Sequence, residues 1–450
     1  MHLAKSVDVG GGLGAIVCHG QMSVEDMARL KKENEAMTME EFEGYAYVEG
    51  GVCAARGFVA NGMNCGINPD KDKNDLGMVC SEAPCNTAAV YTQNKVQGAP
   101  ITVTKEHLAR SGGVSRAVIV NSKNANTCNV DGIQVAEAVS ELTAKELGIP
   151  EEHVIVASTG VIGERLAIEP FQAGIPSLVK GLTREGHAEA VKAIMTTDTV
   201  EKEVAVQFTL QGKTCTLGGM AKGSGMIHPN MATTLNFITS DVAISSELLQ
   251  RALDDVVKVT YNCLTVDGDT STNDMVSVMA NGLAGNGEIA EEGMDYQTFR
   301  QALYIVMMNM TKMLAADGEG ASKFLECTCL GAKDLDTAIA VAKSVVGSDL
   351  FKCAMFGEDA NCGRVMCAIG YAPADFDIMK VNVMLESKAG SFTACENGMA
   401  VPFSEEEAAR VLAEDEIYIQ VDLQQGDVSA KAWGCDLTYD YVKINGDYRS

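Results

Sequence analysis

The stretch Lys222-Gly-Ser-Gly-Met-Ile-His-Pro-Asn-Met-Ala-Thr-Thr-Leu235 lies in the middle of the 450-residue chain and decides how the rest is interpreted. It places the small residue Ala232 before the hydroxyl residue Thr233, and glycines ahead of both. The Thr233 hydroxyl could attack the Ala232 carbonyl, convert the peptide into an ester, and leave a threonine with a free α-amine after hydrolysis. An α-amine has a pKa of roughly 7.7 to 8, so near neutral pH part of it can accept the hydroxyl proton. The stretch therefore predicts a self-cleaving nucleophile, with an ordinary strand threonine as the alternative.

Size and charge limit the classes of protein that this chain can belong to. At 450 residues it is long enough for two lobes. Its 35 basic and 61 acidic residues give a formal net charge of −26, which repels phosphate backbones, so we expect no nucleic-acid partner. No apolar run reaches about 18 residues, and the N-terminus lacks the features of a secretion signal. We therefore expect no membrane span and a cytoplasmic protein.

Cysteine and histidine usage indicates neither a disulfide framework nor a metal site. The fifteen cysteines are odd in number, are spread from Cys18 to Cys435, and never occur as Cys-x-x-Cys. Reduced and mostly buried thiols fit this distribution. None of the six histidines lies near another at ligand spacing, so we expect no metal ion.

From residue 50 onward, short apolar runs bounded by glycine alternate with amphipathic segments, which is typical of a layered α/β protein. The pattern predicts strands at residues 52–67, 76–80, 88–92 and 117–121, hairpins at 204–217 and 417–432, and a last strand at 441–445. It predicts helices at residues 188–195, 247–259, 299–314 and 338–346. We interpret residues 1–43 as an N-terminal extension of unknown role.

Three polar loops follow apolar segments and are candidates for a site. Ser158-Thr159-Gly160 ends a buried strand, where a hydroxyl and a backbone N–H can be presented to an anion. Residues 264–274 form an unusually polar run, and Glu319 lies between two glycines, which leave its carboxylate little cover. Ordinary turns and solvated loops are the alternative for each of the three.

Together, these motifs resemble the ornithine acetyltransferases of the ArgJ family. The resemblance covers residues 44–450 and is carried first by Lys222-Gly-Ser-Gly-Met-Ile-x-Pro-Asn-Met-Ala-Thr233, which resembles the autocleavage segment of that family. The other matching motifs occur in the order of the family: Gly50-Gly51-Val52 with Gly57-Phe58, Val120-Asn121 with Asn124-Ala125-Asn126, Ser158-Thr159-Gly160, Met195-Thr196-Thr197-Asp198, Val266 to Asp274, Asp317-Gly-Glu-Gly320, and Asp359-Ala-Asn361 with Gly363-Arg364.

The resemblance implies a self-processing N-terminal-nucleophile enzyme of the ArgJ/DmpA-like fold. Cleavage between Ala232 and Thr233 would give an α chain, residues 44–232, and a β chain, residues 233–450, with two of each in the assembly. Thr233 would be the nucleophile, and Thr159 and Gly160 would form the oxyanion hole. Substrate would be bound by Thr196, Lys222, Thr233, Glu319, Asn445 and Ser450.

The reaction implied is a ping-pong transfer in arginine biosynthesis. N2-acetylornithine would acylate Thr233, and glutamate would collect the acetyl group. No metal or organic cofactor is required, and acetyl-CoA is an open possibility as a second acetyl donor. The alternatives are an autoprocessing amidase or aminopeptidase of the same fold, and an uncleaved homologue without catalysis.

Four residues differ from those that we expect in this family. His228 replaces a small apolar residue, Thr234 a methionine, Lys123 a glycine and Cys362 a tryptophan. Thr234 adds a rival hydroxyl, but Thr233 keeps the register after Met-Ala. We therefore expect acetyl transfer to be retained, with rate and substrate range affected.

Overall fold

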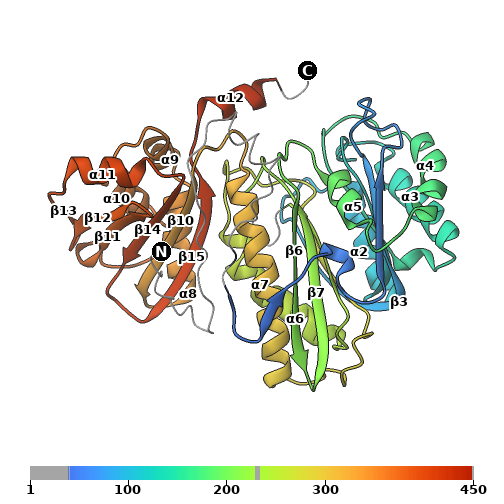
Figure 1. Ribbon diagram of the computed structural model, residues 1–450. Coiled ribbons are helices and arrows are strands. Elements are labelled where there is room, and N and C mark those ends of the chain that lie inside the picture. Colours follow the sequence, from blue (N-terminus) through green and yellow to red (C-terminus); the bar gives the residue numbers. More distant parts are fainter. Residues whose placement is uncertain (1–38, 40, 229–233, 448–450) are drawn as a thin grey trace.

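A computed structural model describes residues 39, 41–228 and 234–447 of the chain. Two β-sheets with helices packed on them make up the molecule, with the long helix α7 between the two sheets (Figure 1). One sheet has nine strands in the order β1-β6-β7-β8-β9-β3-β4-β5, with β2 paired to β3. The other has six strands in the order β13-β12-β11-β14-β10-β15. The layered α/β class and its two lobes, predicted from the sequence, are confirmed.

The strands of the nine-stranded sheet are β1 (Tyr45–Tyr47), β2 (Phe58–Met63), β3 (Leu76–Tyr91), β4 (Val114–Asn121), β5 (Val154–Ser158), β6 (Lys202–Leu210), β7 (Lys213–Lys222), β8 (Leu235–Ser240) and β9 (Met275–Ala280). Those of the six-stranded sheet are β10 (Phe324–Ala332), β11 (Asn382–Ser387), β12 (Gly390–Glu396), β13 (Met399–Ala400), β14 (Glu416–Asp422) and β15 (Val428–Cys435). The helices are α2 (Ala99–Ser111), α3 (Gly132–Leu147), α4 (Glu169–Lys180), α5 (His187–Ile194), α6 (Ser246–Val259), α7 (Met294–Ala316), α8 (Leu335–Val346), α9 (Asp349–Phe356), α10 (Cys362–Gly370), α11 (Glu405–Leu412) and α12 (Tyr439–Gly446).

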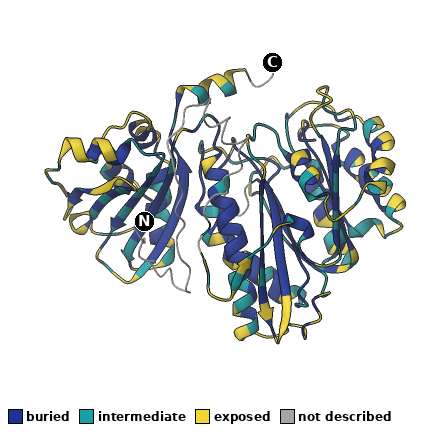
Figure 2. Ribbon diagram, viewed as in Figure 1, coloured by how far each residue is buried: buried dark blue, intermediate teal, exposed yellow. Residues whose placement is uncertain are grey.

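Helix α7 contacts β6 and β7 of one sheet and β10 and β15 of the other, and most of its length is buried (Figure 2). Its buried cation Lys312 lies 3.1 Å from Glu326 of β10, whose other oxygen is 2.6 Å from Lys431 of β15. Burial alone raises the pKa of Glu326, but the two ammonium groups outweigh burial and hold the pKa at about 2. A charged cluster therefore joins α7 to the six-stranded sheet.

The segment between β7 and β8 joins two neighbouring antiparallel strands, with Lys222 paired opposite Leu235. Both sides of the predicted cleavage bond therefore lead into one sheet, and the bond does not mark a boundary between the lobes. If the chain is cut there, the hydrogen bonds between β7 and β8 would keep the two products together.

Three sequence-based predictions of elements were wrong. Residues 51–53 form a 3-10 helix, because Gly50 and Gly51 adopt positive φ values of 111° and 45°, and the strand starts only at Phe58. The two separate strands predicted at residues 76–80 and 88–92 are one long strand, β3, which ends at Tyr91 and has an irregularity between Cys80 and Cys85.

Residues 441–445 belong to helix α12 instead of a strand. The Thr438 hydroxyl accepts hydrogen bonds from the N–H groups of Asp440 and Tyr441, which starts the helix. The helices predicted at 188–195, 247–259, 299–314 and 338–346 are confirmed as α5, α6, α7 and α8.

No helix among the described residues is long and apolar enough to cross a lipid bilayer. The cysteines of the described part are all free thiols. In that same part, no group of three or more His, Cys, Asp or Glu side chains is arranged to hold a metal ion.

Candidate functional site

Three of the predicted site residues, Thr159, Gly160 and Lys222, lie where strands of the nine-stranded sheet end. Thr159, Gly160, Thr196, Lys222, Glu319 and Asn445 are described, whereas Ala232, Thr233 and Ser450 lie outside the described residues. The roles predicted for all of them stay predictions, and the contacts below define the surroundings in which those roles would be performed.

Lys222 is the last residue of β7 and is only 9% exposed. Its ammonium makes no ion pair or hydrogen bond with any residue in the described ranges, although it acts electrostatically on Asp198 and Asp274. A nearly buried cation that contacts no anion destabilises the folded protein unless an anionic ligand binds to it. Lys222 is therefore suited to bind a carboxylate.

A buried ion-pair network holds the loop after α5, which carries Thr196. Lys202 Nζ lies 2.7 Å from both Asp198 Oδ1 and Asp317 Oδ2. Asp198 also accepts hydrogen bonds from the N–H of Thr196, over 3.0 Å, and of Gly223, over 2.6 Å. Burial alone raises the pKa of Asp198, but the ammonium groups of Lys202 and Lys222 outweigh it and hold the pKa below its ordinary value.

The end of α7 delivers Glu319 to the same region. Its N–H donates to the Ser224 carbonyl over 2.8 Å, and its Oε2 accepts from Asn445 Nδ2 of α12 over 2.7 Å. A Cβ on Gly225 would come within 2.3 Å of the Glu319 carboxylate carbon, so any larger residue there would displace this carboxylate. Two residues predicted to bind substrate, Glu319 and Asn445, are therefore in direct contact.

The turn after β5 places Gly160 against the backbone of the neighbouring loop. Gly160 has φ +129°, and a Cβ on it would lie 2.2 Å from the carbonyl carbon of Lys123. The N–H of Thr159 donates to the Asn121 carbonyl over 2.9 Å. The N–H of Gly160 and the hydroxyl of Thr159 make no hydrogen bond with the described residues. These two groups are therefore the donors that an oxyanion could use.

A cavity of about 600 Å³ connects these loops. Gly160, Thr196 and Ile444, the neighbour of Asn445 on α12, all line it. The turn Ser158-Thr159-Gly160, named the anion-binding turn for its predicted role, therefore faces the same space as the Thr196 loop and the C-terminal helix. This space is large enough for an amino-acid derivative.

Two carboxylates of the polar run at residues 264–274 bind backbone N–H groups of the segment between β7 and β8. Asp267 accepts hydrogen bonds from the N–H of Met226, over 2.6 Å, and of Ile227, over 3.0 Å. Asp274 accepts from the N–H of Thr234 over 2.8 Å. The polarity of this run makes it a candidate site in the sequence, but neither carboxylate has a predicted role, because a contact about 40 residues away leaves no local signal.

Two of the four departures from the family pattern, His228 and Thr234, make side-chain hydrogen bonds. The His228 ring lies 2.9 Å from the Thr265 hydroxyl, and its burial lowers the pKa to about 4, with a further contribution from Lys343. Its imidazole is therefore neutral near pH 7. The Thr234 hydroxyl accepts a hydrogen bond from Asn236 over 2.5 Å.

Lys123 is exposed and lines the cavity beside Gly160, with φ +73°. Cys362 begins α10 and packs on the core around the six-stranded sheet.

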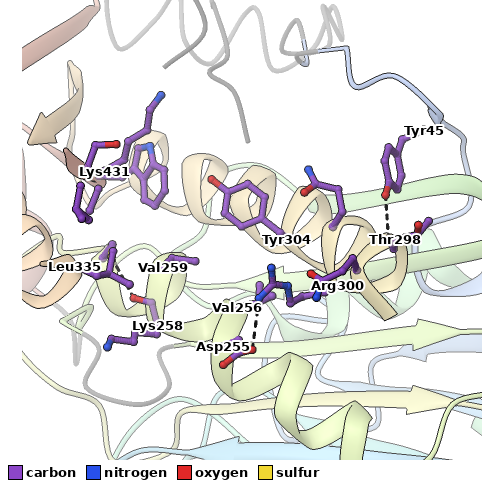
Figure 3. Close-up of a pocket in the computed structure, with 17 residues that line it drawn as sticks. Tyr45, Asp255, Val256, Lys258, Val259, Thr298, Arg300, Tyr304, Leu335 and Lys431 are labelled. Atoms are coloured by element: carbon purple, nitrogen blue, oxygen red, sulfur yellow. Dashed lines mark hydrogen bonds and ion pairs between the residues drawn. The ribbon is translucent and has the colours of Figure 1, made fainter. Parts of the chain in front are cut away.

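A second cavity, of about 610 Å³, lies where α6, α7 and β15 meet and contains none of the predicted site residues (Figure 3). Its lining cations each face a carboxylate: Lys258 with Asp336 at 2.6 Å, Arg300 with Asp255 at 3.6 Å, and Lys431 with Glu326 at 2.6 Å. The charges of this cavity therefore give no reason to place an anionic ligand there.

Fold and site together define a layered α/β protein in which the nearly buried cation Lys222, the Thr159-Gly160 turn and the Glu319 carboxylate are candidates for one site. The model of the ArgJ family matches residues 59–450. The "Arginine biosynthesis bifunctional protein ArgJ" of Geobacillus stearothermophilus is 48% identical over 406 residues, which cover 90% of this chain and 97% of that protein. The protein of the same description from Bacillus subtilis is 47% identical, over 90% and 97% of the two chains.

Solved structures with sequence similarity include an ornithine acetyltransferase complexed with ornithine from Mycobacterium tuberculosis. It is 37% identical, and the match covers 42% of this chain and 100% of that chain with a TM-score of 0.38. An ArgJ protein from Bacillus halodurans is 46% identical over 42% and 98% of the two chains, with a TM-score of 0.40.

This chain belongs to the ArgJ family. The family predicted from the sequence is confirmed, and with it the prediction of an acetyltransferase of arginine biosynthesis.

Proposed function

We propose that this acetyltransferase moves an acetyl group from N2-acetylornithine to glutamate through an ester on Thr233, after cleavage between Ala232 and Thr233. The observation that carries the proposal is the nearly buried ammonium of Lys222, which makes no ion pair with the described residues and ends the strand that leads into the cleavage segment. Donor and acceptor are both α-amino acids, and both carry the α-carboxylate that such a cation would bind.

In the first half-reaction, the free α-amine of Thr233 takes the proton of its own hydroxyl. The hydroxyl oxygen attacks the acetyl carbonyl, and the Thr159 hydroxyl and the Gly160 N–H stabilise the oxyanion. The C–N bond breaks, the proton passes to the leaving nitrogen, and ornithine departs. In the second half-reaction, the glutamate α-amine attacks the ester and restores the Thr233 hydroxyl. Neither step uses a metal or organic cofactor, and acetyl-CoA is a second candidate donor.

Glu319 is proposed to bind the side-chain ammonium of ornithine. The residue is 8% exposed, its carboxylate accepts a hydrogen bond from Asn445, and its backbone N–H donates to the Ser224 carbonyl. A carboxylate fixed in this way attracts a cationic amine in a setting where water screens the charge little. Thr196 and Ser450 are proposed to complete the substrate contacts.

The family resemblance also leads us to propose a cytoplasmic assembly of two α and two β chains. The ladder between β7 and β8, which runs from Leu217 opposite Ser240 to Lys222 opposite Leu235, supports the retention of both chains after cleavage. Sedimentation of the purified protein under native conditions would measure the stoichiometry.

An assay of products tests the proposed reaction. With acetylornithine and glutamate, the enzyme should form N-acetylglutamate and ornithine in equal amounts. Formation of acetate without N-acetylglutamate would instead identify an amidase. Acetyl-CoA supplied in place of acetylornithine would measure use of the second donor.

Lys222→Met tests the role of the buried cation. It should raise the KM for acetylornithine roughly tenfold to a hundredfold, since a hydrogen bond to a charged group contributes about 1.5–3 kcal/mol. Lys213→Met, at the exposed start of the same strand, is the matched control and should leave KM unchanged. Equal KM values in the two variants would contradict the role given to Lys222.

A further inference from the structure

Thr234 is held by its backbone on both sides. Its N–H donates to Asp274 Oδ1 over 2.8 Å, and its carbonyl accepts from the N–H of Met275 over 3.0 Å. Its φ is +68°, a left-handed conformation that a β-branched residue rarely adopts. A Cβ on Gly223 would lie 2.6 Å from the Thr234 methyl carbon, so that side chain is also closely packed. The surroundings therefore impose this conformation on Thr234.

Asp274 is a carboxylate in a buried position, where charged side chains are rarely found without partners. It is 3% exposed, and its second oxygen, Oδ2, has no hydrogen-bond partner among the described residues. Burial raises the pKa of Asp274 to about 7, against the opposing effects of the Thr234 N–H, Ser271 and Lys222. A buried carboxyl with one unsatisfied oxygen destabilises a fold. Stability alone therefore gives no account of its presence.

The preceding residue, Asn273, holds the anion-binding turn. Its Nδ2 donates to the carbonyls of Ser158, over 3.0 Å, and Ala125, over 2.6 Å. Ser158 directly precedes Thr159. Two adjacent residues therefore connect the turn that carries the proposed oxyanion donors to the start of β8.

We propose that Asp274 is a positioning residue for the nucleophile. Thr234 is joined to Thr233 through one planar peptide unit, and the Thr234 N–H that Asp274 holds is part of that unit. Asp274 fixes the orientation of that peptide unit, and Asn273 fixes the position of the proposed oxyanion donors relative to it. The inference rests on the proposed role of Thr233 as nucleophile.

The test compares Asp274→Ala with Asp274→Asn in the full-length protein. Asn keeps an acceptor for the Thr234 N–H, whereas Ala removes it. We expect Asp274→Ala to slow cleavage and lower kcat about tenfold to a hundredfold, with little change in the KM for acetylornithine, because small displacements of reacting groups act on the rate of the chemical step. Asp274→Asn should stay within about threefold of the wild type in both readouts.

Asp241 provides the matched control at the opposite end of β8. It is also buried and also accepts backbone hydrogen bonds, from the N–H of Thr216 over 2.7 Å and of Arg56 over 3.2 Å. Asp241→Ala should lower thermal stability and leave cleavage and kcat unchanged. If Asp274→Ala fails to fold, Asp274→Ser replaces it, because the serine hydroxyl is too short to reach the Thr234 amide.

Normal cleavage and kcat in Asp274→Ala would overturn the inference, as would equal losses in Asp274→Asn and Asp274→Ala. Failure of the proposed function has a different signature. Acetyl transfer that persists in Thr233→Ala would contradict the proposed function, whatever rates the Asp274 variants show.

Discussion

Asn445, on the C-terminal helix α12, donates a hydrogen bond of 2.7 Å to Oε2 of Glu319, 126 residues earlier in the chain. Thr438, at the start of α12, also donates to the Gly320 carbonyl over 2.7 Å. The C-terminal helix, labelled α12 in Figure 1, is therefore attached at two points to the loop that follows α7, and its Ile444 lines the cavity.

Asn445→Ala should weaken substrate binding, because Glu319 loses the donor that orients its carboxylate. We expect the KM for acetylornithine to rise about threefold to tenfold, with a smaller change in kcat. Lys443→Ala, on the same helix and exposed, is the control for loss of helix structure and should behave as the wild type. Steady-state kinetics of the three proteins would check this, and a normal KM in Asn445→Ala would contradict it.

Gly160→Ala should displace the backbone of the anion-binding turn and with it the proposed oxyanion donors. The added Cβ would meet the Lys123 backbone at 2.2 Å, so the turn must move. We expect kcat to fall about a hundredfold or more, the order of magnitude for loss of an oxyanion donor. Gly163→Ala is the matched control, because Gly163 also has a positive φ, +81°, but a Cβ added there would meet no described atom within 4 Å. Single-turnover rates that are equal in the two variants would contradict the role given to Gly160.

Lys202→Met should destabilise the protein strongly, since it leaves the buried carboxylates of Asp198 and Asp317 without their shared cation. Removal of one partner from a buried ion pair lowers the free energy of unfolding by about 3–5 kcal/mol. Lys192→Met, which breaks the exposed pair with Glu189, should change it by less than about 1 kcal/mol. Urea unfolding followed by circular dichroism would measure both, and similar small changes would argue against a structural role for the network.

The fold class, several elements and the family could be predicted from the sequence where the signal is local, whereas the predicted site residues stay predictions. Hydrophobic periodicity gave the four helices, and the motif order gave the family. The strand predicted at residues 441–445 was wrong because alternation over five residues resembles a strand, although the Thr438 cap with Asp440 was a readable helix signal.

Long-range pairing explains what could not be predicted. Lys202 lies in the charged run Glu201-Lys202-Glu203, which is typical of a solvated surface, yet it is fully buried because Asp317 reaches it from α7. The contacts of Asp274 depend in the same way on the β8–β9 pairing, and those of Asp267 on the isolated bridge between Ile227 and Thr270.

Asp274 should make stability depend on pH near neutrality. Burial raises its pKa from 3.8 to about 7, so the unfolded chain releases this proton at a lower pH than the folded protein does. The stability contributed by the protonated carboxyl is therefore fully present below about pH 4 and is lost as the pH rises through about 7. Thermal melting from about pH 5 to about pH 8 should show a steeper fall for the wild type than for Asp274→Asn, which cannot titrate. Parallel curves would contradict this assignment.

The central claim, that Thr233 is freed by cleavage and then carries the acetyl group, is tested most directly by intact-mass spectrometry. Purified enzyme is incubated with acetylornithine without glutamate, quenched in acid and measured. We expect two chains from the wild type. The second begins at Thr233, and its mass increases by one acetyl group during incubation, whereas Thr233→Ala stays as one unmodified chain. A wild-type protein that is active as a single uncut chain, or that carries its acetyl group on another residue, would contradict the account.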